Sequence, residues 1–553
     1  MARLARAWVY LMCLAAIAAP PCWAQPVPTA RLPQDAAREP QPAARNAALL
    51  IDRDRYAEQV PAGADALRFR LEGIDLSGNV SLPSSRFEGL WADLMGREVT
   101  LAQVFDIAAR ISAIYRDAGY VLSQALVPQQ AITQAGGQVR IRVAEGYVAR
   151  ISVSPGVRGA DRMARLLAPI RNERPLTLAT LERYLLLLGD LPGVRSQAVL
   201  RAGSEANAAD LELVVERDLQ GFSAAVHNRT SAAVGPLRWE ASAERRGLFR
   251  EFDRHALRWI GAGSERLNLL AYNGDAPVGL QGASLIWSAS ASRSRPKSGE
   301  LFQFNTRSDN ASLGLAYPLL RSRAANLSLR GSLAAYNGRS DIGDGLPVSQ
   351  ERLRSLRLGA SADLTDAMGG VNLLDLEIAR GLSGLGASRR GDPLLARAGL
   401  NPQFTKATLY AARLQSLGGE WSLLAAVSAQ HSDDLLSSAE QFGLGGDAFL
   451  RAFDPSELLG DRGAAAKLEL RYNTLLGPVG ATVYAYGDTG SVQQRAIDAA
   501  ATRQSASAVG LGLRFSGSQG LRGYVEVAKP IHRDTVRHGD RRARGFAGLG
   551  IDF

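Results

Sequence analysis

The chain contains almost no cysteine. Both copies, Cys13 and Cys22, lie near the start of a sequence of 553 residues. A fold held together by disulfides and a cysteine-ligated metal site are therefore excluded for the rest of the chain. The five histidines are widely scattered and form no HExxH or H-x₃-H pair, which argues against a zinc enzyme. We expect no metal and no cofactor.

Long apolar runs are also missing after the first two dozen residues. The longest candidate, Tyr184 to Leu191, is interrupted by Gly189 and Asp190 and is far shorter than the ~20 residues that a membrane-spanning helix needs. The sequence has no Walker motif and no G-x-S-x-G elbow, so nucleotide hydrolysis and acyl transfer are unsupported. The net charge of +10 is mild for this length and does not indicate a nucleic-acid partner. We do not expect an enzyme.

The first residues carry an export signal. Arg3 and Arg6 precede an apolar run from Ala7 to Ala19, and Ala24 is a small residue suited to cleavage. This pattern predicts a secretory signal peptide over residues 1–24. A membrane anchor is the alternative, but the run is too short to span a bilayer. The mature chain is then a soluble exported protein or an outer-membrane β-barrel.

Residues 25–66 form a proline-rich linker at first, since five prolines interrupt regular structure: Pro26, Pro28, Pro33, Pro40 and Pro42. Prolines are absent from 43–59, where Ala, Leu and Arg dominate. We expect one short helix there, with a thin apolar face formed by Leu49, Leu50 and Tyr56.

Two units of similar pattern follow, at 67–147 and 148–218. Each is expected to run strand–helix–helix–strand–strand, which is enough for a small α+β domain. In the first unit we expect strands at 69–76, 120–128 and 138–144 and helices at 87–94 and from Thr100 to Gly119. In the second we expect strands at 149–154, 197–202 and 210–216 and helices at 163–170 and 181–188.

From residue 219 to 553 the pattern changes to short alternating strands. Leu468, Leu470 and Tyr472 share one face of such a strand, while Lys467, Glu469 and Arg471 share the other. A soluble sandwich also alternates, but this segment is too long for one, and short turns such as 417–419 alternate with long loops such as 381–402. These features and the C-terminal Phe553 favour an outer-membrane barrel of about 16 antiparallel strands.

Taken together, the chain resembles the two-partner secretion transporters (the TpsB family of haemolysin and filamentous-haemagglutinin exporters). The resemblance implies two periplasmic α+β POTRA domains followed by a C-terminal transmembrane β-barrel. It is most specific from Glu440 onward, a region that includes Leu450-Arg451-Ala452-Phe453, where the family has Val/Ile-Arg-Gly-Phe/Tyr on a loop that folds back into the barrel. Ala452 departs from the family's Gly, which matters because Gly adopts positive φ at little cost.

A second family motif, Phe-x-Asp-x-Gly on a barrel strand, is matched by Tyr486-Gly487-Asp488-Thr489-Gly490. The resemblance implies that Asp488 faces the lumen and pairs with Arg451. A guanidinium and a carboxylate can form two parallel hydrogen bonds, which would fix both the position and the direction of the loop.

The resemblance also implies a function. The helix at 43–59 would plug the resting pore, and the POTRA domains would receive an unfolded, β-helical TpsA-like exoprotein for secretion without nucleotide. The location would be the outer membrane of a Gram-negative bacterium, with lipid and lipopolysaccharide around the barrel and the barrel-assembly machinery acting during biogenesis. Three alternatives stay open: a barrel-assembly or translocation relative with another client, a passive porin, and an outer-membrane hydrolase.

Overall fold

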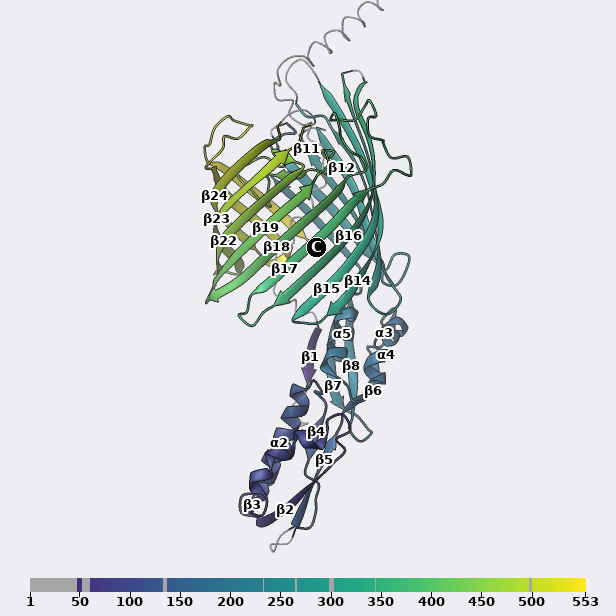
Figure 1. The fold of residues 1–553 in the computed structure, drawn as a ribbon, viewed down its shortest axis with the longest axis vertical. Helices are drawn as coiled ribbons and strands as arrows, with labels where there is room; N and C mark the ends of the chain where they lie inside the picture. Colours follow the sequence, from purple (N-terminus) through teal and green to yellow (C-terminus); the bar gives the residue numbers. More distant parts are fainter. Residues whose placement is uncertain are drawn as a thin grey trace, which may run out of the picture.

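The computed structural model describes residues 47–51, 60–132, 137–231, 233–263, 266–297, 303–343, 345–496 and 500–553. A barrel forms one end of the elongated molecule, and two small α+β domains extend from it in a line (Figure 1). The expected signal peptide at 1–24 lies outside the described residues. Within the described residues, no helix combines the length and apolar character needed to cross a membrane.

The first small domain is a four-stranded sheet covered on one face by a helix. Its strands β2 (Arg68–Ser77), β3 (Glu98–Thr100), β4 (Gln124–Leu126) and β5 (Gly137–Ala144) are ordered β3-β2-β5-β4. Helix α2 (Leu101–Asp117) begins where the sequence predicts, because the Thr100 hydroxyl accepts from the Gln103 amide and the Gln103 side chain accepts from the Thr100 amide. Ile111 and Tyr115 of α2 are fully buried in the domain core.

The helix expected at 87–94 is not an α-helix. Three single 3₁₀ turns occupy Ser84–Arg86, Glu88–Leu90 and Ala92–Leu94. Gly89 lowers the helix propensity of this short stretch by about 1 kcal/mol. The apolar spacing was nevertheless informative, because Phe87 and Trp91 are both buried in the core against α2.

The second domain repeats the topology of the first. It consists of β6 (Tyr147–Val153), α3 (Ala160–Leu166), α4 (Ala168–Asn172), α5 (Leu178–Gly189), β7 (Val194–Ala202) and β8 (Ala208–Arg217). In both domains the first and last strands are parallel neighbours (β2 with β5, β6 with β8), and the strand before the last pairs antiparallel with the last (β4 with β5, β7 with β8). The helix expected at 163–170 is two short helices, α3 and α4, with Pro169 in the first turn of the second.

The helix expected at 43–59 is wrong for residues 47–51. Strand β1 (Ala47–Ile51) instead pairs in parallel with β7 and completes a sheet of order β1-β7-β8-β6. An open sheet edge presents unpaired backbone N–H and C=O groups, and pairing with them outweighs the helix propensity of Ala and Leu, which is a weak preference. The other residues of this segment lie outside the described residues.

Sixteen strands form a closed antiparallel barrel, as the sequence predicted. Strand β26 pairs with β9 to close it. The strands are β9 (Gln220–His227), β10 (Arg238–Arg246), β11 (Arg254–Ala262), β12 (Leu267–Val278), β13 (Ala283–Ser294), β14 (Phe304–Arg321), β15 (Ala325–Ile342), β16 (Leu346–Thr365), β17 (Val371–Gly381), β18 (Thr405–Gly418), β19 (Trp421–Ser432), β22 (Arg462–Leu476), β23 (Val479–Gln494), β24 (Thr502–Ser516), β25 (Leu521–Pro530) and β26 (Arg544–Asp552).

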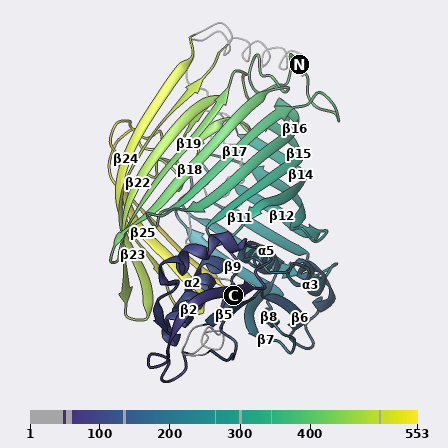
Figure 2. The ribbon, with the colours of Figure 1, turned by 60° about the horizontal axis from the view of Figure 1, so that its bottom comes forward.

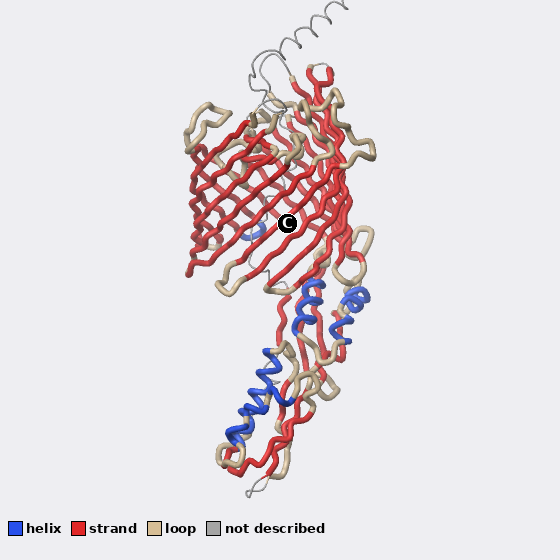
Figure 3. The backbone as a smooth tube through the Cα atoms, in the orientation of Figure 1, coloured by secondary structure: helices blue, strands red, loops and turns tan. Residues whose placement is uncertain are grey.

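The two faces of each barrel strand have opposite chemistry. On β22, Leu468 and Leu470 are exposed on the outer wall, whereas Lys467 and Glu469 are buried on the inner wall. Long loops gather at the end of the barrel away from the small domains, and short connections lie at the other end (Figure 3). This is the organisation of an outer-membrane barrel, with an apolar outer band and a polar interior.

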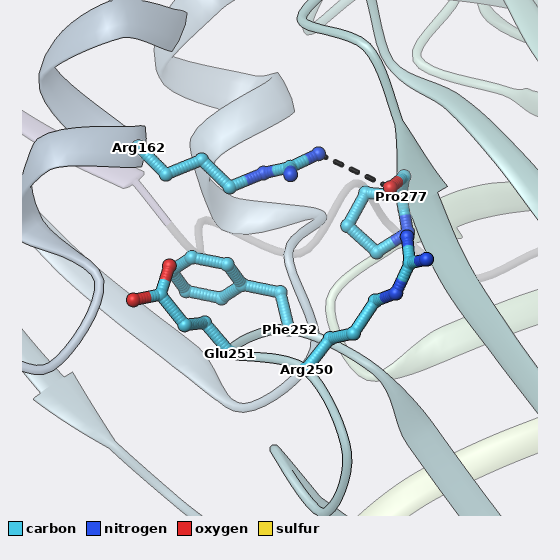
Figure 4. Close-up of a pocket in the computed structure, with 5 residues that line it drawn as sticks. All are labelled: Arg162, Arg250, Glu251, Phe252 and Pro277. Carbon is cyan, nitrogen blue, oxygen red and sulfur yellow. Dashed lines mark hydrogen bonds between the residues drawn. The ribbon is translucent and has the colours of Figure 1, made fainter.

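The second small domain is held against the barrel mouth (Figure 2). Phe252, in the turn between β10 and β11, is 1% exposed and belongs to the apolar core of that domain. The Arg217 guanidinium lies 4.5 Å from its ring centroid and donates to the Glu251 carbonyl at 2.7 Å. Arg162 of α3 donates to the Pro277 carbonyl at 3.1 Å (Figure 4). The barrel turns therefore fix the orientation of the domain.

We predict that Phe252→Ala loosens this junction. Removing a buried Phe side chain costs about 3–5 kcal/mol, so limited proteolysis of the full-length protein should cut next to residue 218 much faster. Phe249→Ala is the matched control, because Phe249 lies in the same turn but is 78% exposed. Equal cleavage rates for the two variants would show that Phe252 does not anchor the domain.

Candidate functional site

The loop between β19 and β22 folds into the barrel lumen. Strands β20 (Phe442–Leu444) and β21 (Leu458–Gly460) form its stem, and the tip lies between them. Leu450, Ala452 and Phe453 at the tip are no more than 1% exposed. They pack in one apolar cluster with inward-facing residues of the wall: Ala412, Leu424, Ala426, Ala465, Tyr484, Tyr486, Val492, Ala506, Ala508, Ala528 and Phe546.

Small wall residues leave room for the loop stem. A Cβ atom on Gly490 would lie 2.7 Å from Leu444 Cδ1, and one on Gly463 would lie 2.3 Å from Phe442 Cδ1. Within the motif of β23, alternate residues Tyr486, Asp488 and Gly490 face the lumen, while Gly487 and Thr489 are exposed on the outer wall. The loop stem lies directly against Gly490, which leaves no room there for a side chain.

Arg451 and Asp488 are in direct contact. Arg451 Nε donates to Asp488 Oδ2 at 3.1 Å and Nη2 donates to Oδ1 at 3.3 Å, which makes the contact bidentate. The Arg451 backbone N–H also donates to Asp488 Oδ2, at 3.2 Å. Arg451 is 2% exposed and Asp488 3%. In this position the carboxylate holds both the side chain and the backbone of the loop tip.

Two further carboxylates surround the Arg451 guanidinium. Arg451 Nη1 donates to Glu469 Oε2 on β22, and Glu526 Oε2 on β25 lies 3.9 Å from the same nitrogen. The guanidinium carbon also sits 3.2 Å from the centroid of the Tyr486 ring. The tip arginine is thus bound on three sides by groups from β22, β23 and β25.

The wall balances these carboxylates with cations and hydroxyls. Glu469 accepts from Arg514 Nη1 and from Arg471 Nε, both at 2.8 Å. Glu526 accepts from the hydroxyls of Tyr484 and Tyr486, both at 2.8 Å. Burying an unpaired charge is expensive, so this network is what allows a buried Arg451 to be stable in the lumen.

Arg229, just after β9, also holds the loop tip. Its Nη1 donates to the Arg451 carbonyl at 2.7 Å and to the Gly446 carbonyl at 3.2 Å. Its Nη2 donates to Glu526 Oε1 at 2.6 Å, and its side chain is buried over the Phe546 ring. One buried arginine therefore ties the backbone of the tip to the wall near the β9–β26 closure.

The base of the loop is held by ion pairs of its own. Arg397 Nη1 and Nη2 donate to the two oxygens of Asp461 at 2.8 and 3.2 Å. Lys406 Nζ lies 2.7 Å from Glu440 Oε2, and Arg357 Nη2 donates to Glu440 Oε1. The Glu440 end of the loop is thereby attached to the inner wall, and the Asp461 end is attached to the loop between β17 and β18.

Ala452 does not occupy the positive-φ position that would favour a glycine. The tip places its positive φ at Leu450 (56°) rather than at Ala452. Gly445 and Gly446 supply further positive φ values, and a Cβ on Gly445 would lie 2.0 Å from the Asp454 carbonyl oxygen. The turn therefore forms without a glycine at 452.

Phe553 lies at the barrel closure rather than at the loop. Its backbone N–H donates to the Phe222 carbonyl at 2.8 Å, and the Phe222 N–H donates to the Phe553 carbonyl at 3.2 Å, while its side chain is 75% exposed.

Sequence reasoning did not single out Glu469, Glu526 or Arg229 as site residues. Glu469 and Glu526 alternate with apolar residues, which is the one signal that could have identified them, and Arg229 has no such signal.

A closed barrel with an internal loop and two periplasmic α+β domains defines a class of outer-membrane protein translocators. The family model of haemolysin secretion/activation proteins ShlB/FhaC/HecB matches residues 221–515, and a model of the ShlB-type POTRA domain matches residues 69–146. The chain belongs to this family of two-partner secretion transporters. It is an outer-membrane secretion pore with its POTRA domains in the periplasm.

Known proteins of this kind align along most of the chain. The heme/hemopexin transporter protein HuxB of Haemophilus influenzae (strain 86-028NP) is 24% identical, covering 89% of both chains. The outer membrane transporter CdiB of Dickeya dadantii (strain 3937) is 26% identical over 76% of both. The solved structure of CdiB from Escherichia coli has the same fold, with a TM-score of 0.71 at 19% identity, covering 90% of this chain and 92% of that one.

We predict that Gly490→Ala displaces the loop stem, whereas Gly487→Ala does not. The new methyl group at 490 would collide with Leu444, and overpacking of this kind costs about 1–3 kcal/mol. A Cβ on Gly487 meets nothing within 4 Å. Protease sensitivity of the loop in folded, heat-modifiable barrel is the measurement. Identical digestion of the two variants would contradict the packing role of Gly490.

Proposed function

We propose that this chain exports one unfolded exoprotein and that the Arg451–Asp488 contact holds the lumenal loop in its resting position. The supporting observation is the bidentate contact of a fully buried loop arginine with a wall carboxylate, reinforced by Glu469. Such a contact is directional and leaves neither charge unpaired. Moving the loop away from the wall would therefore require these charges to find other partners.

The periplasmic units are proposed to receive the exoprotein along a strand edge. We assign POTRA domains to 67–147 and 148–218 and the barrel to 219–553, with 25–66 as the preceding linker. Support comes from β1, which pairs in parallel with the edge of β7. An extended exoprotein segment could use the same edge, since strand addition depends on main-chain hydrogen bonds and not on a particular sequence.

The proposed partner is a secreted, β-helical exoprotein of the TpsA kind. The relatives named above are transporters, and one of them is named for heme and hemopexin. We propose that this chain acts as a conduit and not as a catalyst. Lipid and lipopolysaccharide around the barrel, and the barrel-assembly machinery during biogenesis, complete the proposed partners.

We predict that Arg451→Ala reduces secretion more than Asp488→Ala does. Removing the arginine takes away the guanidinium that holds Asp488 in a bidentate contact, and breaking a buried pair from one side costs about 3–5 kcal/mol. In Asp488→Ala, Arg451 retains Glu469. Arg451→Lys should rescue poorly, because it keeps the charge but loses the planar fork. Exoprotein in the medium is measured against the amount of folded barrel.

The double variant Arg451→Ala/Asp488→Ala should secrete about as poorly as Arg451→Ala alone, because both changes remove one contact. Arg503→Ala is the control, since this arginine is exposed on β24. Independent, additive losses from the two substitutions would mean that the contact does not control the loop.

We also predict that deleting residues 61–217 leaves a barrel that inserts but does not secrete. The deleted residues contain both proposed receiving domains, whereas the barrel closes through its own strands. Heat-modifiable migration reports barrel assembly and exoprotein in the medium reports export. Undiminished secretion by the shortened chain would refute the receiving role.

A further inference from the structure

Three arginines lie side by side on the outer wall of the barrel. Arg293 on β13 pairs in register with Arg307 on β14, which pairs in register with Arg339 on β15. All three are exposed. Their strand neighbours Ser292, Ser308 and Ser340 are buried on the inner wall, so alternation places the arginines outside. We call Arg293, Arg307 and Arg339 the arginine row.

The arginine row is electrostatically unbalanced. Like charges directly opposite each other on paired strands are destabilising. Arg339 Nε donates to Asp341 at 2.8 Å, but within the described part of the chain neither Arg293 nor Arg307 forms an ion pair. Asp309, which alternation puts on the same face of β14, is the other acid nearby. Two nearby acids against three adjacent guanidiniums leave the row with a net positive charge, which an anion from outside the chain can balance.

The position of the row identifies where that anion lies. Below it, toward the periplasmic end, the polar pair Asp309 and Asn337 comes first, and the outer wall of β14 and β15 is then apolar, with exposed Leu313, Leu315, Leu329 and Leu333. The row begins two residues beyond exposed Ala291 on β13. Figure 1 shows β14, β15 and β16 as long neighbouring strands on one side of the barrel. The row therefore marks the extracellular edge of the apolar band, at the depth of lipid headgroups.

Neighbouring strands extend the positive charge. Arg352 on β16 and Arg380 on β17 are exposed, and alternation places them on the same outer wall. Arg352 pairs in register with Asn337 of β15, and Arg380 pairs with Leu356 of β16. Barrel strands are tilted, so positions at one height shift by one to two residues from strand to strand. On the other side of the barrel, exposed Thr489 of β23 and Ser505 of β24 occupy the corresponding edge. Exposed Arg503 of β24 and Lys529 of β25 are single cations at this edge, paired in register with Gln493 and Val509 and not with another basic residue.

We propose that the arginine row binds the phosphate groups of a lipid in the extracellular leaflet, of the lipopolysaccharide class. Guanidinium groups match phosphate with paired hydrogen bonds. Strands lie about 4.8 Å apart, so the row spans about 10 Å and can engage more than one phosphate. The leucines below it suit acyl chains, which a free phosphate or an acidic peptide lacks. The proposal depends on the membrane location of the barrel and not on secretion.

The test uses the full-length protein in phosphatidylcholine nanodiscs, with and without bisphosphorylated lipid A. The triple variant Arg293→Gln/Arg307→Gln/Arg339→Gln is compared with wild type and with Arg503→Gln/Lys529→Gln, whose residues are exposed on β24 and β25. Native mass spectrometry counts bound lipid A, and heat-modifiable migration gives the unfolding temperature. We expect at least tenfold weaker lipid A binding in the triple variant alone.

The unfolding temperature gives a second test, because its expected change differs with and without lipid A. Lipid A should raise it in wild type and in the control variant but not in the triple variant. Without lipid A, the triple variant should unfold at the same temperature as wild type or higher, since like charges have been removed. Dephosphorylated lipid A should have little effect on any of the three proteins.

Three results would overturn the proposal. Equal lipid A binding by wild type and the triple variant would remove the row from lipid recognition. Full reproduction of the stabilisation by millimolar inorganic phosphate would make the row a general anion site. A triple variant that is less stable than wild type without lipid A would show that the row serves the fold itself.

Discussion

The buried guanidinium of Arg451 is the constraint around which the lumen is arranged. A charge at 2% exposure is tolerated only where fixed anions surround it. Three strands supply them: β22 provides Glu469, β23 provides Asp488 and β25 provides Glu526. Each carboxylate then needs its own partners, which accounts for the inward arginines and tyrosine hydroxyls along the same wall. The loop and that side of the barrel therefore form one electrostatic unit.

Apolar packing and charge contribute differently to the position of the loop. Phe449, Leu450 and Phe453 bury substantial apolar area against alanines of the wall, but this attraction is non-directional and would tolerate small shifts. The bidentate Arg451–Asp488 contact is directional and permits one register. Gly490 removes the steric obstacle where the stem lies against β23. Packing holds the loop against the wall, and the directional Arg451–Asp488 contact fixes its position there.

The sequence predicts those features that repeat or that carry local chemistry. Alternation along 467–472 places Glu469 inside the barrel, and the Thr100–Gln103 capping box marks the start of α2. It does not predict β1, because Ala47–Ile51 became a strand through pairing with a distant edge. The sequence pattern also does not identify Arg229 and Phe252, since each lies in a connection between strands. Their partners, the Arg451 carbonyl and a domain core, are set by long-range topology.

The first barrel hairpin connects the two ends of the molecule. Arg229, between β9 and β10, holds the loop tip at the extracellular side, and the turn after β10 inserts Phe252 into the second POTRA domain. Strand β9 also closes the barrel, through five paired residues with β26. Because strands are stiff and the contacts at both ends are buried, a rearrangement of this hairpin would disturb both together. The clamp on Arg451, the barrel closure and the POTRA junction consequently share one structural element.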